Sequence, residues 1–257
     1  MAQQISVYPI KMKLPIDGNP SAASLPLMAA LVETNKELIL IDTGFPGSTD
    51  LLDQLALLQF DLQDVTSIIN THTHTDHIGG NHLFPTARII ASVIDYNYQR
   101  DYSYALINTQ NPTEVVSRFF PHSNSQNIEA AALHSQMLAK KYWRDDLLGP
   151  LDRIDWLEDK CALPEKIEII KTPGHTPGHV AVVVRGDSQS FTAAGDAMPS
   201  RLFWKRRLHE ITPRFSSAQF LRSKSKIENL HGIIMGGHDL PFQTSDLKYI
   251  NRDRIVL

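Results

Sequence analysis

The stretch Thr71-His-Thr-His-Thr-Asp-His-Ile-Gly-Gly80 decides how the rest of this sequence is interpreted. Four candidate metal ligands lie within six residues of it: His72, His74, Asp76 and His77. In an extended segment His72 and His74 point to the same side, whereas the other two fall where the chain turns before a pair of glycines. Two imidazoles on one centre, with an aspartate–histidine pair beside it, indicate a binuclear metal site. Neutral imidazole and carboxylate suit zinc, with iron, manganese or nickel as alternatives.

A run of histidines can also be a polar loop or a purification tag. A tag would be terminal and unbroken, whereas this run is internal and follows an apolar segment, 66–70. It also contains Asp76 and ends in two glycines. The pattern therefore favours a functional site.

A second candidate element is the loop Lys171-Thr-Pro-Gly-His-Thr-Pro-Gly-His179. Its two Pro-Gly pairs predict a tight loop between two strands, which holds His175 rigidly and brings backbone close to whatever that side chain binds. Taken alone, a histidine in such a loop is more often structural. Here, however, a zinc centre with His72 and His74 lacks a third protein ligand, which His175 can supply. His179 is either a supporting or a structural residue.

Two further candidates end apolar segments later in the chain. Asp196 closes the segment 191–196, where Gly195 leaves space beside the carboxylate. A carboxylate there can bridge two cations about 3.5 to 4 Å apart, although an isolated aspartate in this position is equally typical of a turn or a helix cap. His238 ends the apolar segment 233–238 in the same way. Because ligands collect at strand ends in α/β sheets, both residues belong to the candidate site.

Apolar runs and helical spacings around these elements predict a layered α/β architecture. Strands are expected at 37–42, 66–70, 88–92, 166–171, 180–185, 190–194 and 232–235, and helices at 48–60 and 216–230. Residues 95–160 are polar, aromatic-rich and mostly helical in period, which predicts a helical insertion. Since no repeat or long linker interrupts the pattern, residues 1–257 are expected to form a single domain.

The composition excludes several classes of protein. The 257 residues include 25 basic and 28 acidic side chains, and a formal net charge of −3 is not typical of a general nucleic-acid binder. Cys161 is the only cysteine, which excludes an intrachain disulfide and suits a reducing compartment. The longest weakly polar run, 22–32, is about half the length of a membrane span and contains Pro26. We therefore expect a soluble, cytoplasmic protein without a membrane segment.

Taken in order along the chain, these elements resemble the metallo-β-lactamase superfamily. The resemblance covers most of the chain, from Asp42 in Ile-Asp-Thr-Gly to His238. It implies an αββα sandwich with the helical insertion before the third metal-binding element, and a site for two divalent metal ions at one edge. Carried over residue by residue, the resemblance implies that a first metal is held by His72, His74 and His175, and a second by Asp76, His77 and His238. It implies that Asp196 bridges the two metals. Asp42 would orient ligands without binding a metal.

Within the superfamily, the chain is most similar in layout to the N-acyl homoserine lactonase group. The shared features are the full ligand set, the helical insertion and the segment Gly237-His238-Asp239. The resemblance implies a hydrolase that uses a metal-bridging hydroxide to cleave a small-molecule carboxylic ester, above all a lactone, or a related thioester. Asp76 would pass the proton to the leaving group. Lactonases of this group carry a tyrosine shortly after the bridging aspartate, whereas this chain has Asp196-Ala-Met-Pro199.

Two alternatives to an esterase remain. A phosphodiesterase or nuclease could use the same two-metal site, and only the basic run Arg201-Leu-Phe-Trp-Lys-Arg-Arg207 favours it. That run is equally typical of a basic surface loop that is anchored by its Phe and Trp. A non-catalytic metal-bound sensor is the second alternative, and the complete set of seven ligand positions disfavours it.

The insertion also carries a group of tyrosines at helical spacings. These are Tyr96, Tyr98, Tyr102 and Tyr104. Their spacing favours core or dimer packing over substrate contact. A homodimer formed through the insertion is therefore one expectation.

Overall fold

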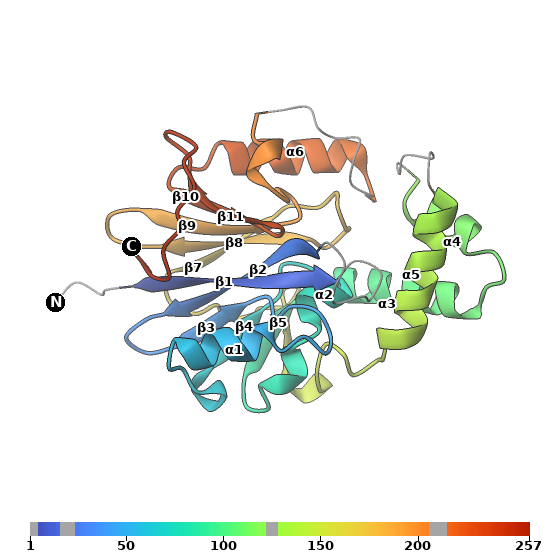
Figure 1. Ribbon diagram of the computed structural model, residues 1–257, viewed down its shortest axis with the longest axis horizontal. Helices are drawn as coiled ribbons and strands as arrows, with labels where there is room; N and C mark the ends of the chain where they lie inside the picture. Colours follow the sequence, from blue (N-terminus) through green and yellow to red (C-terminus); the bar gives the residue numbers. More distant parts are fainter. Residues whose placement is uncertain (1–4, 16–23, 122–127, 206–214) are drawn as a thin grey trace.

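The computed structural model describes residues 5–15, 24–121, 128–205 and 215–257 of the chain. Within these ranges two β-sheets lie face to face (Figure 1). The first sheet has the strand order β12-β1-β2-β3-β4-β5-β6. Its strands are β1 (Ser6–Pro15), β2 (Ser24–Glu33), β3 (Leu38–Ile41), β4 (Ser67–Ile69), β5 (Arg88–Ala91), β6 (Ile154–Trp156) and β12 (Ile255–Val256).

The second sheet has the strand order β11-β10-β9-β8-β7. Its strands are β7 (Ile167–Lys171), β8 (Val180–Arg185), β9 (Ser190–Gly195), β10 (Ile233–Gly236) and β11 (Asp239–Gln243). In this sheet only β9 and β10 pair in parallel among the described strands. In the first sheet β3, β4, β5 and β6 are parallel neighbours. In both sheets, the parallel strands have their carboxyl ends at the same edge of the sandwich, and the candidate ligands come directly after these ends.

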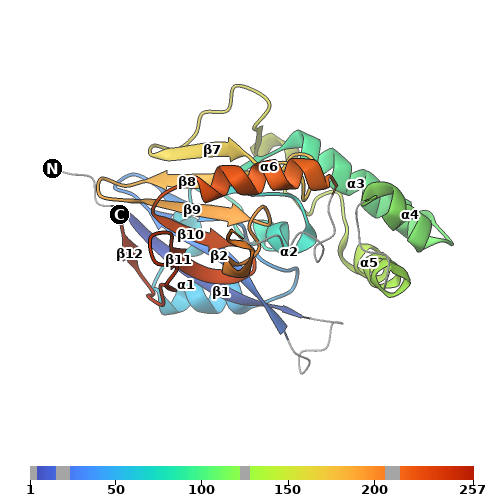
Figure 2. The same ribbon diagram turned by 90° about the horizontal axis from the view of Figure 1, so that it is seen from above.

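One helix covers the outer face of each sheet (Figures 1 and 2). Helix α1 (Asp50–Leu57) buries Leu51 and Leu55, which join the apolar cluster on the outer face of the first sheet. Helix α6 (Ser217–Glu228) buries Phe220 and Ile227 against the second sheet. The resulting order of layers is helix, sheet, sheet, helix. This confirms the αββα sandwich expected from the sequence.

The core between the sheets explains why the short strands were visible in the sequence. Ile39 and Ile69 of the first sheet pack in one apolar cluster with Val182 and Phe191 of the second. All four side chains are at most 1% exposed. Strands buried on both faces need apolar residues at every position, so they appear as continuous apolar runs.

Three helices form a group at one end of the sandwich (Figure 1). These are α3 (Val93–Asn108), α4 (Pro112–Phe119) and α5 (Ile128–Tyr142). Tyr96 and Tyr102 are buried, and Tyr98 stacks edge-on against Phe119. No helix in the described ranges is long and apolar enough to cross a membrane.

Four strands of the first sheet were not predicted from the sequence as strands: β1, β2, β6 and β12. Strand β2 overlaps the described part of the run 22–32 and lies between β1 and β3 in the sheet. Prolines in β1 and β2 weaken their strand signal, since proline cannot donate to a sheet ladder. Strand β6 lies inside the predicted helical range 95–160, and it pairs in parallel with β5. That range therefore contributes a strand to the sandwich as well as helices.

Candidate metal centre

All seven predicted ligands lie in segments that follow strands at one edge of the sandwich. Because β3 and β4 are parallel, Asp42 and the segment 72–77 both follow carboxyl ends at the same edge. Asp196 and His238 follow the parallel strands β9 and β10. His175 comes from the loop between β7 and β8. The structure thus brings together side chains from two different sheets.

The first group of ligand atoms consists of three imidazole nitrogens. His74 Nδ1 lies 3.1 Å from His72 Nε2 and 3.1 Å from His175 Nε2. A zinc–nitrogen bond of about 2.0–2.1 Å gives tetrahedral ligands an edge of roughly 3.3 Å. The spacing of these three nitrogens therefore fits a single ion.

The second group consists of Asp76, His77 and His238. Asp76 Oδ2 lies 3.7 Å from His77 Nε2 and 3.9 Å from His238 Nε2. Asp76 and His77 lie on the one-turn helix α2 (Thr75–Ile78). All ligand atoms of this group lie within 4.8 Å of one another, a spacing that can hold a metal ion.

Asp196 lies between the two groups and presents one oxygen to each. Its Oδ2 is 3.3 Å from His175 Nε2 in the first group. Its Oδ1 is 3.3 Å from His238 Nε2 and 3.8 Å from His77 Nε2 in the second. This placement matches the bridging role that the resemblance implies for Asp196.

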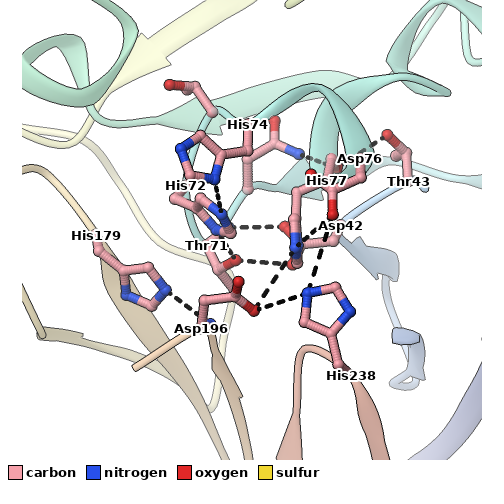
Figure 3. A network of polar contacts seen from close by, with 12 residues as sticks. Asp42, Thr43, Thr71, His72, His74, Asp76, His77, His179, Asp196 and His238 are labelled. Carbon is pink, nitrogen blue, oxygen red and sulfur yellow. Dashed lines mark hydrogen bonds and ion pairs between the residues drawn. The ribbon is translucent and has the colours of Figure 1, made fainter. Parts of the chain in front are cut away.

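Asp42 is hydrogen-bonded to Thr71 and to His77 of the second group without being a candidate ligand itself (Figure 3). Its carboxylate accepts hydrogen bonds from the Thr71 N–H (2.8 Å), the Thr71 hydroxyl (2.8 Å) and His77 Nδ1 (2.9 Å). Because the Thr71 hydroxyl donates to Asp42, it accepts from His72 Nδ1, 3.1 Å away. In both histidines the proton is thereby held on Nδ1, and Nε2 is left for a metal.

His179 and Pro26 orient two further ligands. The Asp196 N–H donates to His179 Nε2 (3.0 Å), so the His179 proton sits on Nδ1 and faces Thr172 Oγ1 at 2.9 Å. His238 Nδ1 donates to the Pro26 carbonyl (2.9 Å), which turns Nε2 toward the second group. His179, which was either supporting or structural on the sequence alone, therefore supports the Asp196 backbone.

The site contains buried polar atoms that a cation would satisfy. His77 Nε2 and Asp196 Oδ1 are buried and have no hydrogen-bond partner among the described residues. Such atoms are rare in native proteins because an unpaired buried polar group is costly. Both belong to ligand groups that can hold metal ions. The donor set of imidazoles and carboxylates suits divalent zinc, and it also suits iron, manganese and nickel.

Burial dominates the titration of the first group. It lowers the pKa of His72 well below the usual value, because the charged imidazole would lose its hydration and would repel the neighbouring histidines. Burial also lowers the pKa of His175 to about 3, although the negative charge of Asp196 acts in the opposite direction. These two imidazoles are therefore neutral at pH 7, the form that binds metal.

Negative charges dominate in the second group. Burial opposes protonation of His77, but Asp76 and Asp42 together outweigh it and raise the pKa to about 10. Burial is likewise outweighed at His238, where Asp196 raises the pKa to about 9. In the metal-free protein both histidines are therefore protonated on both ring nitrogens at pH 7 and carry a positive charge.

Metal loading at pH 7 is therefore expected to release about two protons, because His77 and His238 must lose theirs before Nε2 can bind. Metal affinity should rise with pH from 7 to about 10 for the same reason. Calorimetric titration of zinc in buffers with different ionisation enthalpies measures the number of protons. The variant His238→Gln should release about one proton fewer, and heats that do not depend on the buffer would contradict the prediction.

In the described part of the basic run 201–207, Arg201 is held by contacts within the fold. The Arg201 guanidinium lies 3.9 Å from the centroid of the Tyr249 ring, and its Nη1 donates to the Leu247 carbonyl. Phe203 and Trp204 are buried in the cluster under α6. This arrangement supports the interpretation as an anchored surface loop. The last two residues of the run lie outside the described residues.

Sequence reasoning missed one buried carboxylate beside the site, that of Asp95. The pattern Ser92-x-x-Asp95 is a recognisable helix start, and the Ser92 hydroxyl does cap α3. The contacts of the Asp95 carboxylate, however, are made to loops that are distant in the sequence.

Comparisons with known proteins place these features in a family. N-acyl homoserine lactonase AiiA of Bacillus thuringiensis subsp. kurstaki is 23% identical over 249 residues, which cover 86% of this chain and 84% of AiiA. The solved structure of a quorum-quenching N-acyl homoserine lactone lactonase matches with a TM-score of 0.61 at 20% identity, covering 93% of this chain and 92% of its own. That of AidC, a dizinc quorum-quenching lactonase, matches with a TM-score of 0.61 at 20% identity, covering 84% and 74%. A sequence model of the metallo-beta-lactamase superfamily matches residues 26–252, so the chain belongs to that superfamily.

Proposed function

We propose that this protein is a binuclear zinc hydrolase that cleaves a carboxylic ester, with lactones of the N-acyl homoserine type as its preferred class. Membership of the superfamily supports a metal-dependent hydrolase. The observation that carries the two-metal part is the position of Asp196, whose two oxygens face two separate groups of ligand atoms. The names of the lactonase relatives support the substrate class. A cytoplasmic location is part of the proposal, since a single cysteine suits a reducing compartment.

An aromatic wall beside the first ligand group supports a substrate with an apolar part. The ring of Phe120 lies 6.5 Å from that of His74, and Tyr98 lies 6.0 Å from Phe120. Phe215 packs edge-on against Tyr98, and its N–H donates to the His175 carbonyl. The wall comes from α3, the residue after α4 and the segment before α6, and Phe120 joins it to the apolar cluster of the three helices. Aromatic rings in such a place favour an acyl chain.

The residues of the site have distinct roles in this proposal. The metals, when bound, supply Lewis-acid chemistry, which lowers the pKa of water toward 7 and polarises a carbonyl. The residues that would hold them are His72, His74, Asp76, His77, His175, Asp196 and His238. Asp76 also shuttles the proton to the leaving group, because its side chain is 18% exposed and so lies within reach of a substrate.

The position of the lactonase tyrosine is occupied by a different kind of residue. Ala197 and Met198, which follow Asp196, are both fully buried and offer no hydroxyl. The Tyr98 hydroxyl donates to the Phe119 carbonyl. The substrate carbonyl is thus expected to depend on the metals for polarisation, without a tyrosine hydroxyl from these positions.

The proposal is tested with zinc-loaded protein and a panel of N-acyl homoserine lactones, thioesters and bis-p-nitrophenyl phosphate. Lactone or ester turnover with kcat/KM of at least about 10⁴ M⁻¹s⁻¹ is expected. Along a series of acyl chains, KM should fall by up to about fourfold per methylene until the aromatic wall is covered, since each buried methylene contributes about 0.8 kcal/mol. Preference for the phosphodiester would contradict the ester class. A protein with two bound metals and no turnover across the panel would contradict a hydrolase.

A further inference from the structure

Asp95 is a buried carboxylate that contacts both loops of the first ligand group. Its Oδ2 accepts hydrogen bonds from the Thr73 N–H (2.7 Å) and the Thr73 hydroxyl (3.0 Å). Its Oδ1 accepts from the Gly178 N–H (2.9 Å). Thr73 lies between His72 and His74, while Gly178 lies in the loop of His175. One side chain therefore bonds both backbone segments that carry the three imidazoles.

The position of Asp95 is itself fixed by the start of α3. The Asp95 N–H donates to Ser92 Oγ (3.2 Å), and the hydroxyl of Ser92 donates to Glu158 (2.6 Å). Asp95 lies in the first turn of the helix, where the helix dipole favours a negative charge. These contacts hold the carboxylate in place against the cost of its complete burial.

Gly178 gives a second, independent observation. A Cβ at this position would lie 2.2 Å from Ser92 Oγ and 2.6 Å from the Asp95 nitrogen. Only glycine lets the loop of His175 approach the start of α3 closely enough for the bond to Asp95. The backbone of the loop is thus fitted to this carboxylate.

We propose that Asp95 is a positioning residue that sets the spacing between His72, His74 and His175, and with it the affinity of the first group for its metal. This inference rests on the proposed metal-dependent function. Each carboxylate oxygen accepts from a backbone N–H of a different loop. An asparagine has one acceptor oxygen, so its NH₂ group would face one of those N–H donors and push a loop away. Partners of this kind typically change metal affinity by about 10–100-fold when they are replaced.

The electrostatic surroundings agree with this role. Burial lowers the pKa of His74, and the negative charges of Asp76, Asp95 and Asp196 act against that lowering. The charge of Asp95 thus acts on the pKa of His74. A negative charge beside three neutral imidazoles also favours a divalent cation among them.

The test measures zinc and cobalt binding by the full-length protein carrying Asp95→Asn. Stepwise affinities are obtained by competition with a chelator, and the visible spectrum of bound cobalt reports the ligand geometry. We expect one equivalent to bind about 10–100-fold more weakly, with an altered cobalt spectrum, and the other to change by less than about threefold. His175→Ala and His238→Ala identify which equivalent belongs to which group. Asp101→Asn is the matched control, since it makes the same change on the exposed side of α3.

Unchanged affinity for the first equivalent, or equal weakening of both, would overturn the proposal. If Asp95→Asn does not fold, Thr73→Val decides, because it removes only the hydroxyl bond to Asp95. A selective but smaller loss at the first equivalent in Thr73→Val would then support the role, and an unchanged first equivalent would overturn it. Binding is measured without turnover, so failure of the substrate panel would reject the proposed reaction and leave this result standing.

Discussion

Replacement of Asp196 by alanine is expected to lower kcat/KM for ester hydrolysis by about 10³-fold or more and to leave fewer than two metals bound. Asp196 presents one oxygen to each ligand group, at 3.3 Å from His175 Nε2 and 3.3 Å from His238 Nε2. Its loss removes a ligand from both positions at once, and with it the stabilisation of charge that develops in the transition state. Steady-state kinetics and metal analysis by mass spectrometry measure the two effects.

The matched control for Asp196→Ala is Asp187→Ala. The carboxylate of Asp187 is 52% exposed and lies 3.8 Å from Lys166 Nζ. Asp187 precedes β9, whereas Asp196 follows the other end of that strand. This variant should retain two metals and wild-type kinetics. An Asp196→Ala protein that keeps two equivalents and full activity would show that the bridge assigned to Asp196 is wrong.

Removal of the metals with a chelator is expected to lower the melting temperature by roughly 8–16 °C. A ligand that binds only the folded state stabilises it by about 4 kcal/mol at a free concentration 1,000-fold above its Kd. For a chain of this size, each kcal/mol corresponds to about 2–4 °C. The effect arises because the ligand groups are buried and assembled only in the folded sandwich.

Thermal unfolding of the same protein with zinc, with chelator, and with zinc restored checks this expectation. Zinc should restore the original melting temperature. Asp196→Ala should show a smaller difference between the zinc and chelator samples than the wild type does. Equal melting temperatures in all three wild-type samples would mean that metal binding and folding are not linked.

The candidate ligands that the structure brings together could be found in the sequence because their positions are marked locally. Four of them are neighbours in the stretch 71–80, and Asp196 and His238 follow apolar runs that are buried on both faces. His175 is marked instead by the two Pro-Gly pairs of its loop. A strand with such burial appears in the sequence as a continuous apolar run, and the residue directly after the run lies where the strand leaves the sheet. Glycines beside Asp196 and His238 mark the close approach of backbone to the site.

The strands and supporting contacts that were missed depend on partners distant in the sequence. Strand β1 contains Pro9 and Pro15, and β2 contains Pro26, yet the ten residue pairs between these strands form a regular ladder. Strand β6 has only three residues, and it is a strand only because β5 lies beside it. The contacts of Asp95 likewise join α3 to loops before and after it.

The division of the ligands between two sheets has a consequence for biogenesis. The segment 72–77 follows the first sheet, and His175, Asp196 and His238 belong to the second, which is completed late in synthesis. A nascent chain that has released only its first 160 residues carries four ligands, yet it lacks the bridge and the third imidazole of the first group. Tight metal capture therefore has to wait for the final strands. Metal binding would thus follow completion of the second sheet, and a metal-loaded protein would be a fully folded one.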